Sequence, residues 1–408
     1  MTRAQLNEII NNGENSGIEF KRDDVKPEQL PRECVALANL KGGMILLGVE
    51  DNGVISGLTK QKEELERWIM GTVFFRYIQP TVIPFYEEVI LEDNKRVGII
   101  KIEQGTSKPY AVKLNDKFEF YIRAGSTSRP ATREQIIRLS QEGGMIHVES
   151  LAVSGTSFDD INLEIFRQFY NKNYGENIKM DDKETLIEKL TQLDMLVKSS
   201  VSELVCSIAG ILLFGRDPRK YLYQSGMRLI AYPSLEPDID ASVDTEINGC
   251  LAEMKDEFGN ILFPGLITKI EQRLQLIIYH EKLENGGFKR IGEWDYPIDV
   301  LRELIVNSFV HRDWSMTIQN RIEIFPNRIE ITSRGALPNS QTIEKILAGT
   351  QYPRNNILLK TIKDLGFMED RGLGIRRKVI PVLKEKKFPD PVFEATEDYF
   401  KITIYKYL

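Results

Sequence analysis

The stretch that decides the fold is Leu301-Arg302-Glu303-Leu304-Ile305-Val306-Asn307-Ser308-Phe309-Val310-His311-Arg312-Asp313-Trp314-Ser315. Its pattern predicts a helix that runs into a polar loop. Glu303, Asn307 and His311 recur every four residues and share one helical face, whereas the other face is mainly apolar. We therefore expect a helix that is buried on one side and presents an acid, an amide and an imidazole on the other.

An acid and an amide one turn apart suit a magnesium nucleotide. The amide oxygen of Asn307 is a hard, neutral ligand, and the carboxylate of Glu303 can orient or deprotonate water. Alternatively, the two side chains are a solvated pair on a surface helix. The residues that follow favour the first interpretation.

The sequence after this helix predicts a β-hairpin and two glycine-containing turns. Polar and apolar residues alternate through 321–324 and 328–331, and Pro326-Asn327 lies between them. Gly335 follows the hairpin, and a second glycine turn at 371–374 precedes a helix. Glycines let backbone N–H groups approach phosphates, and a helix N-terminus favours negative charge.

Helix, hairpin, glycine turn and glycine-rich segment occur in an order that resembles the GHKL ATP-binding fold. The chain is most similar to the divergent ATP-binding module of bacterial proteins described as helicase-like or as transcriptional regulators. The resemblance implies Mg²⁺ on Asn307, water activation by Glu303 and a phosphate lid at Gly372 and Gly374. The implied ATP site comprises Asn307, His311, Gly335, Arg371, Gly372 and Gly374. Ser333 stands where that fold usually has an adenine-reading aspartate, so the base preference stays open.

The composition describes a soluble globular protein of two or three domains. The chain has 408 residues, of which 42% are hydrophobic and 28% charged. A net charge of −6 argues against a generally basic nucleic-acid binder but leaves room for a local positive site. Three scattered cysteines and three scattered histidines argue against a disulfide framework and a Cys/His metal cluster. We expect a cytoplasmic protein with no membrane partner.

Three carboxylates near the N-terminus are a second candidate site. Glu14 and Glu19 surround the start of a predicted strand, and Asp51 follows the apolar strand predicted at 44–49. If the three converge, they can hold Mg²⁺ or Mn²⁺ against a phosphodiester and polarise water. Alternatively, Glu14 is solvated, Glu19 pairs with Lys21, and Asp51 caps a turn.

The surrounding motifs resemble the Schlafen-type AlbA-like domain over about residues 1–140. They comprise Glu14, Glu19-Phe20-Lys21, Ala36-Leu37-Ala38-Asn39 before Gly42-Gly43, the turn at 48–53, and the segment 120–131. In nuclease members of that family, carboxylates matching Glu14, Glu19 and Asp51 form the active site. Other members only bind nucleic acid.

Any phosphate grip in this module must come from a few placed residues. The 20 basic and 20 acidic residues of 1–140 cancel, so no broad electrostatic footprint exists. Arginine forks and hydroxyl groups around a glycine can hold a phosphate. The candidates are Lys21, Arg123, Ser126, Thr127 and Arg129. Alternatively, this turn is solvated and only caps the next helix.

We predict an α+β protein with three parts. Residues 1–140 form the Schlafen/AlbA-like, nucleic-acid-binding module, which is a possible nuclease. Residues 141–197 form a helical connector, and residues 198–408 form the GHKL-like ATP-binding α/β sandwich. A basic stretch at 351–389 surrounds the second glycine turn.

The predicted function is that of an ATP-binding, nucleic-acid-targeting protein and metal-dependent nuclease. RNA, including tRNA, is favoured over DNA, nucleotide binding gates the nuclease, and a role in phage defence or stress follows only from the resemblance. We expect a homo-oligomer. The alternatives are an ATP-responsive DNA-binding transcriptional regulator without nuclease activity, and an assembly protein that dimerises on nucleotide. The three carboxylates favour the enzyme.

Overall fold

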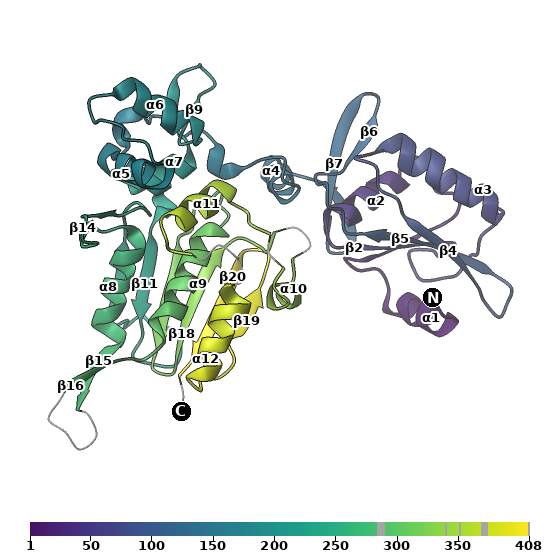
Figure 1. Cartoon of the computed structure of the whole chain (residues 1–408). Coiled ribbons are helices and arrows are strands. Elements are labelled where there is room, and N and C mark those ends of the chain that lie inside the picture. The colour runs from purple at the N-terminus through teal and green to yellow at the C-terminus, as the bar shows by residue number, and fades with distance from the viewer. Residues whose placement is uncertain (284–289, 339–340, 351, 369–373, 407–408) are drawn as a thin grey trace. The chain divides into compact units, whose positions relative to one another are not determined.

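The computed structural model describes residues 1–283, 290–338, 341–350, 352–368 and 374–406. The chain divides into two compact units, Met1–Ile146 and His147–Leu408, and Figure 1 traces the elements of each. Within the described ranges, no helix combines the length and the apolar character that a bilayer span requires.

The first unit is built on a four-stranded sheet of order β1-β2-β5-β4. β1 and β2 are parallel, and the other neighbours are antiparallel. Asn94 at φ 62° makes the turn between β4 and β5. The strands and the helices around them are α1 (Arg3–Asn12), β1 (Ile18–Lys21), α2 (Leu30–Asn39), β2 (Gly42–Leu47), α3 (Lys62–Arg67), η1 (Trp68–Phe75), β4 (Phe85–Ile90) and β5 (Arg96–Glu103).

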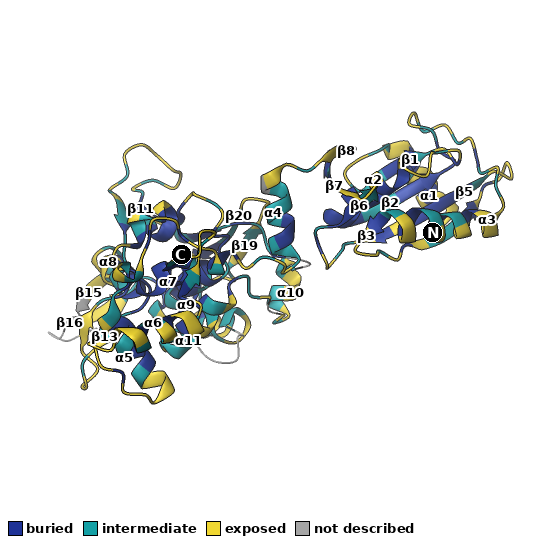
Figure 2. Cartoon of the chain, turned by 90° about the horizontal axis from the view of Figure 1, so that it is seen from above, coloured by how far each residue is buried: buried dark blue, intermediate teal, exposed yellow. Residues whose placement is uncertain are grey.

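Both faces of this sheet are buried. Successive side chains of a strand point to opposite faces, so Leu46 joins Leu6 of α1 in one core while Ile45 and Leu47 join Leu37 of α2 in the other. This explains why β2 is an unbroken apolar run. Figure 2 shows the buried residues concentrated along these strands and the inner sides of the helices.

A second sheet completes the first unit with the order β3-β6-β7-β8. Asn39, at the end of α2, ties this sheet to the helix. Its Nδ2 donates to the carbonyl oxygens of Tyr110 and Tyr121 at 2.9 Å each, and its Oδ1 accepts from Tyr110 N at 2.8 Å. The elements are β3 (Ile78–Gln79), β6 (Ala111–Leu114), β7 (Lys117–Ala124), β8 (Thr127–Pro130) and the following α4 (Arg133–Glu142).

The second unit contains a six-stranded sheet of order β12-β11-β17-β18-β20-β19. β11 and β17 are parallel, and the remaining neighbours are antiparallel. Phe325 pairs with Arg328 across the β17–β18 turn, which confirms the hairpin predicted around Pro326-Asn327. The strands are β11 (Met227–Ala231), β12 (Val243–Ile247), β17 (Asn320–Phe325), β18 (Arg328–Arg334), β19 (Val392–Ala395) and β20 (Tyr399–Tyr405).

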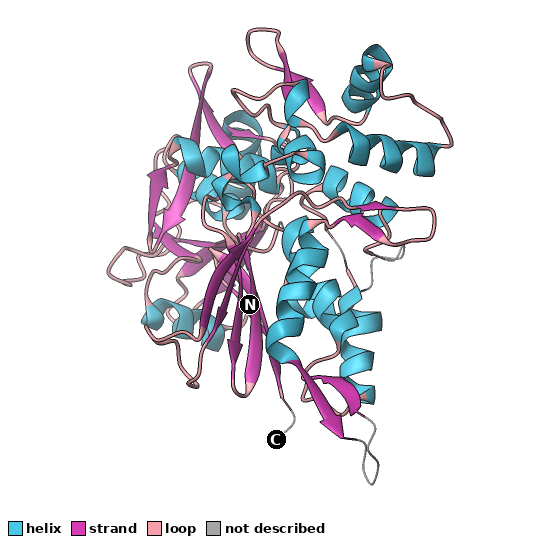
Figure 3. Ribbon diagram, turned by 90° about the vertical axis from the view of Figure 1, so that its left-hand side faces the viewer, coloured by secondary structure: helices cyan, strands magenta, loops and turns pink. Residues whose placement is uncertain are grey.

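Helices cover one face of this sheet, as Figures 1 and 3 show. The central one is α9 (Ile298–Val310), which packs on β18 and contacts α8, η6 and α11. The others are α8 (Leu266–Ile278), α10 (Ile343–Leu347), α11 (Asn356–Asp364), η6 (Gly374–Val379) and α12 (Ile380–Glu385). This arrangement confirms the predicted α+β class.

Smaller elements precede and flank this layer. Phe166 and Phe169 of α5 pack on Phe214 of α7 with ring centroids 5.3 Å apart, so these two helices share a local core. The elements are η2 (Val148–Ser150), η3 (Phe158–Asp160), α5 (Leu163–Tyr174), α6 (Lys183–Gln192), β9 (Leu196–Lys198), β10 (Leu204–Cys206), α7 (Ile208–Phe214), η4 (Pro218–Lys220), η5 (Tyr223–Ser225), β13 (Met254–Lys255), β14 (Ile261–Phe263), β15 (Tyr279–Leu283) and β16 (Arg290–Trp294).

A buried glutamate fastens the start of the second unit to α11. Glu149 is 1% exposed, and its two carboxyl oxygens accept the backbone N–H groups of Ile357 and Leu358 at 2.9 Å each. Burial raises the pKa of Glu149 to about 7, although the backbone hydrogen bonds oppose the shift. The folded chain therefore holds a proton on this carboxyl group at pH values where the unfolded chain has lost it.

We predict that Glu149→Gln alters stability in a pH-dependent way. Because the folded pKa is raised, the wild-type contribution is present below about pH 4.5 and up to about 3 kcal/mol is lost as the pH rises through 7. Glutamine does not titrate but leaves one N–H without an acceptor, which costs about 1–3 kcal/mol. Urea unfolding should show a deficit at pH 5 that narrows at pH 8.

The control for this measurement is Glu164→Gln, since Glu164 is exposed in the first turn of α5. It should leave stability nearly unchanged at both pH values. A Glu149→Gln deficit that widens towards pH 8 would show that the folded chain prefers the charged carboxylate.

Candidate functional site

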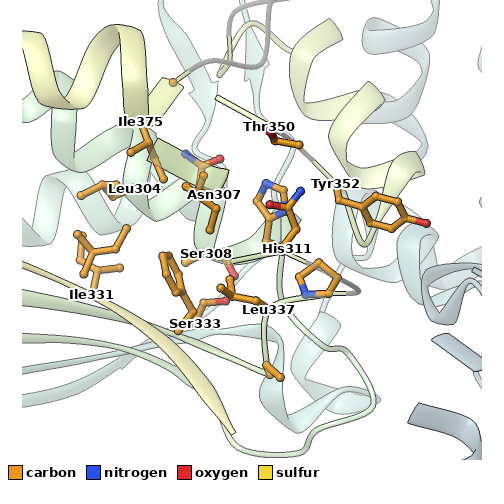
Figure 4. Close-up of a pocket in the computed structure, with 18 of the residues that line it drawn as sticks. Leu304, Asn307, Ser308, His311, Ile331, Ser333, Leu337, Thr350, Tyr352 and Ile375 are labelled. Atoms are coloured by element: carbon orange, nitrogen blue, oxygen red, sulfur yellow. The ribbon is translucent and has the colours of Figure 1, made fainter. Parts of the chain in front are cut away.

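The second unit has a pocket between α9, the sheet and the segments that follow β18. Asn307 and His311 face it from α9, and Thr350 and Tyr352 line another side, as Figure 4 shows. Its apolar lining suits a planar base, and its polar lining offers hydrogen bonds. The apolar residues are Leu304, Ile331, Ile346, Ile375, Phe400 and Ile402, and the polar ones include Asn307, Ser308, His311, Ser333, Gln341 and Thr350.

His311 ends α9 at the pocket wall. Its backbone has φ −97° and ψ 0°, so the helix stops at this residue. Loss of hydration and the nearby positive charge of Arg354 lower the pKa of His311 to about 4. The imidazole is therefore neutral at physiological pH and offers one donor, one acceptor and a ring face.

The segment that precedes α11 stabilises this end of α9. Asn355 is buried, and its Nδ2 donates to the carbonyl oxygens of Val310 and Arg312 at 2.8 Å each. Arg354 pairs with Asp313 at 2.7 Å. These bonds satisfy carbonyl groups that the end of a helix otherwise leaves free.

Gly335 is required by close packing at the end of β18. Its φ is +109°, and a Cβ atom at this position would lie 2.5 Å from Cβ of Asp313. Both the backbone conformation and the contact therefore exclude larger residues. Gly335 also lines the pocket, where we predicted an approach to phosphate.

A buried guanidinium group lies directly behind the pocket. Arg312 is 0% exposed and donates to Asn320 Oδ1 and to the carbonyl oxygens of Met316 and Ile318 at 2.6–2.8 Å. Asn320 Nδ2 in turn donates to Ser308 O at 2.9 Å. The Arg312–Asp313 part of the His-Arg-Asp sequence is therefore structural, because both side chains are committed to the protein interior.

Ser333 occupies the position where the resembled fold usually has an acid. Its hydroxyl donates to Ser308 O at 2.8 Å, so its oxygen is left as an acceptor towards the pocket. An exocyclic amine is a donor and therefore complements it. This geometry is compatible with adenine even though the aspartate is replaced.

Glu303 is close to Asn307 but does not line the pocket. The carboxylate is 3% exposed, accepts from Asn307 Nδ2 at 3.1 Å and pairs with Lys378 at 3.6 Å. A Cβ atom on residue 374 would lie 1.9 Å from Glu303 Oε1, so only glycine permits this approach. Gly374 lines the pocket, whereas Arg371 and Gly372, the other predicted lid residues, lie outside the described residues.

Asn307 fits the role of a magnesium ligand. Its amide nitrogen is turned to Glu303, which fixes the orientation of the group and distinguishes Oδ1 as the ligand atom. Mg²⁺ bound with a nucleotide needs only one or two protein oxygens, because phosphates and water supply the others. Asn307 could therefore bind the Mg²⁺ of a nucleotide without a cluster of acidic side chains around it.

In the first unit, Glu14, Glu19 and Asp51 lie close enough to interact. Glu14 accepts from Phe20 N at 2.8 Å. Burial raises the pKa of Glu14, the hydrogen bond from Phe20 lowers it, and the charges of Glu19 and Asp51 raise it, with a net upward shift. The charges of both Glu19 and Asp51 therefore act on Glu14.

Both oxygens of Glu19 are already paired with cations. Lys21 Nζ donates to Oε1, and Arg123 Nη1 donates to Oε2 at 2.6 Å. Burial lowers the pKa of Lys21, but Glu19, Glu33 and Glu14 raise it more. Within the described part of the chain, no three His, Cys, Asp or Glu side chains are arranged to hold a metal ion. In this arrangement the acids do not fit a shared metal ion.

Arg123 and Lys21 are both paired with Glu19, and this distinguishes them from the other predicted phosphate ligands. The Arg123 side chain is 0% exposed and also bonds Glu33 at 3.0 Å and Asn15 O at 2.8 Å. It therefore connects β7 with α2 and the start of β1. By contrast, Ser126, Thr127 and Arg129 are exposed around β8 and remain accessible to a ligand.

Comparisons with known proteins address both modules. Residues 14–132 match the family model described as Schlafen, AlbA_2, and residues 318–404 match the model described as putative ATP-dependent DNA helicase recG C-terminal. These matches confirm the two-module prediction. They support a nucleic-acid-related protein with an ATPase-like module. The second match begins after α9, so it does not cover Glu303, Asn307 or His311.

Two solved structures are similar to the chain. The crystal structure of the DIP2311 protein from Corynebacterium diphtheriae has 18% identity and a TM-score of 0.44, and the match covers 99% of this chain and 80% of that one. The solution structure of the N-terminal domain of a putative ATP-dependent DNA helicase RecG-related protein from Nitrosomonas europaea has 22% identity and a TM-score of 0.26, with coverage of 32% and 95%. No curated protein matches significantly.

The structure adds residues that the sequence analysis did not single out. Glu33 joins the Glu19–Arg123 network, and Lys378 pairs with Glu303. Thr350 and Tyr352 line the pocket, and Arg354 follows them. The basic character of 351–389 was the only sequence signal for Lys378 and Arg354, and it did not identify Glu303 or Asp313 as their partners.

We predict that His311 stays neutral down to about pH 5. Because its folded pKa is lowered, stability falls as the pH drops from about 6.5 to about 4, where only the unfolded chain takes up the proton. NMR titration of the imidazole signals should give a midpoint near 4. His311→Gln assigns the resonance, and a midpoint above 6 would contradict this environment.

Proposed function

We propose that the chain binds ATP in the pocket beside α9 and targets nucleic acid through its Schlafen-like module. The observation that carries the ATP proposal is the oriented amide of Asn307 in a pocket that combines an apolar base-sized lining with Ser333, His311 and Gly374. The family matches to an ATPase-like and a Schlafen-like module support it.

In this proposal, different residues of the pocket contact the base, its amine and the metal ion of the nucleotide. Leu304, Ile331 and Ile402 contact the base, and Ser333 accepts from its amine. Asn307 holds Mg²⁺, which neutralises phosphate charge when it is bound. In hydrolysis a water oxygen bonds to the terminal phosphorus, the bond to the bridging oxygen of ADP breaks, and Glu303 takes the water proton.

We further propose that nucleotide occupancy gates the Schlafen-like module. Thr350 and Tyr352 line the pocket, and Arg354 and Asn355 immediately follow them and bind the end of α9. The first turn of α11 follows Asn355 and carries the N–H groups of Ile357 and Leu358, which Glu149 accepts. Glu149 lies three residues after the end of the first unit, so a shift of this segment reaches the connection between the units.

A more specific proposal is that the Schlafen-like module cleaves the nucleic acid that it binds. A metal-dependent nuclease is supported by the Schlafen, AlbA_2 match and by the charges of Glu19 and Asp51 acting on Glu14, but it requires the three acids to rearrange before they can share a metal ion. The pairing of Glu19 with Lys21 and Arg123 supports the alternative, an ATP-responsive DNA-binding regulator that does not cut. The preference for RNA and a role in phage defence rest on the family resemblance.

We predict that Asn307→Ala weakens Mg-ATP binding by roughly tenfold or more, because a metal ligand is removed. Glu303→Gln should not weaken binding but should slow any hydrolysis by about 10². Calorimetry with a slowly hydrolysed ATP analogue tests the first effect, and phosphate release tests the second.

The control for Asn307→Ala is binding in EDTA, where the variant and the wild type should be equal. Asn12→Ala, at an exposed position of α1, should match the wild type throughout. Unchanged Mg-ATP affinity in a folded Asn307→Ala protein rules out the assignment.

We predict that the full chain binds labelled RNA or DNA and cuts it with Mn²⁺ or Mg²⁺, and that ATP changes the rate. A metal-dependent cut requires Lys21 and Arg123 to release Glu19, because both of its oxygens are paired with them. If the acids then bind a metal ion, Glu14→Gln or Asp51→Asn should lower cleavage by about 10² while binding is retained. Glu28→Gln, at an exposed position, is the control.

The outcomes separate the candidate functions. ATP-dependent binding without cleavage establishes the regulator and removes the nuclease. Equal cleavage by wild type and both acid variants contradicts the assignment of these residues. If the chain binds neither RNA nor DNA, the nucleic-acid proposal fails.

A further inference from the structure

Glu303 is enclosed by three groups in the structure. Asn307 Nδ2 and Gly374 contact its Oε1, and Lys378 lies 3.6 Å from its Oε2. The carboxylate is only 3% exposed and does not line the pocket that Asn307 and Gly374 line. An acid in this position cannot reach a water molecule beside a bound phosphate until one of its neighbours moves.

Lys378 is the neighbour best able to move. Its side chain is 28% exposed, whereas Asn307 is fixed on α9. Lysine carries a compact charge on a flexible stem of four carbons, so its ammonium group can exchange partners while the backbone stays in place. Lys378 also belongs to η6, whose residues Gly374, Ile375 and Arg376 line the pocket.

We propose that Lys378 exchanges Glu303 for the terminal phosphate of a nucleoside triphosphate. The exchange places a cation on the phosphate and simultaneously releases Glu303 to act on water. The inference rests on the proposed function of the pocket as a nucleotide site. It adds a phosphate ligand and a reason why the acid is held inactive when no triphosphate is present.

The charge of the terminal phosphate and the length of the nucleotide together determine which nucleotide drives the exchange. In the exchange, Lys378 moves away from the carboxylate of Glu303, which has a single negative charge. The new partner must therefore attract Lys378 more strongly than Glu303 does. A terminal phosphate carries more charge and three acceptor oxygens, and charge-assisted bonds to phosphate are strong. ADP also ends in a charged phosphate, but ADP is one phosphate unit shorter than ATP. Its terminal phosphate therefore stops short of Lys378, so ADP should leave Lys378 on Glu303.

The test compares ATP and ADP affinities of the full chain by calorimetry with Mg²⁺. Lys378→Met keeps the length of the side chain and removes its charge. It should reduce affinity for the ATP analogue by roughly tenfold and leave ADP affinity nearly unchanged, so the ATP-to-ADP ratio falls. Glu303→Gln weakens the hold on Lys378 and should raise the ratio. Lys384→Met, at an exposed position on α12, should change neither.

A salt bridge with a purely structural role gives a different pattern. In that case Lys378→Met and Glu303→Gln both lower the stability of the fold, and the ratio of ATP affinity to ADP affinity stays at the wild-type value. That result would overturn the inference. If Asn307→Ala weakens ATP binding as expected but Lys378→Met leaves the ratio unchanged, the nucleotide site stands and only the role of Lys378 falls. If the wild type binds no nucleotide, both fall.

Discussion

The second unit depends on burial of α9 on almost every side. The helix lies on β18 and contacts α8, α11 and η6, and its residues Glu303, Ser308 and Phe309 are all nearly inaccessible. A buried polar group without a partner is costly, so each one on this helix must be satisfied by a specific neighbour. Ser308 O, for example, accepts from both Asn320 and Ser333. The polar bonds that complete the helix thereby determine where β17, β18 and the start of α11 lie.

The same constraint explains why the pocket has its chemical character. Arg312 is directed into the interior, where Asn320 and two carbonyl groups surround it, while His311 remains at the pocket wall. Asn355 caps the end of α9 by donating to the carbonyl oxygens of Val310 and Arg312, on either side of His311. Two adjacent residues thus have different roles: Arg312 stabilises the fold, and His311 lines the pocket. Loss of hydration keeps the imidazole neutral, which suits contact with a base more than with a phosphate.

A buried group of charges connects several elements of the first unit. Arg123 links Glu19 of β1 with Glu33 of α2, and Ser128 of β8 adds a hydroxyl bond to Glu33. Desolvated charges must be well paired, and removal of one partner is more costly than the pair is worth. Glu19, one of the acids predicted to be catalytic, is therefore also structural. For this reason conservative changes at Glu14 or Asp51 are more informative than the loss of Glu19.

The sequence alone determined the class of the fold, the two modules and much of the local structure. Alternation of apolar residues predicted the hairpin at 320–334, because side-chain direction in a strand follows directly from residue order. The four-residue spacing likewise placed Glu303, Asn307 and His311 on one helical face. The glycines at 335 and 374 were recognised as points of close approach, although the atoms that approach them are Asp313 and Glu303.

Only the tertiary structure decided which charges meet. Arg123 and Glu19 are 104 residues apart, and Lys378 lies in a segment whose basic composition named no partner for Glu303. Spacing within a helix or strand carries no information about contacts between distant elements, since those depend on how whole layers pack. For the same reason the sequence suggested the local pair of Glu19 with Lys21 but could not show that Arg123 also holds Glu19 or that Lys378 holds Glu303.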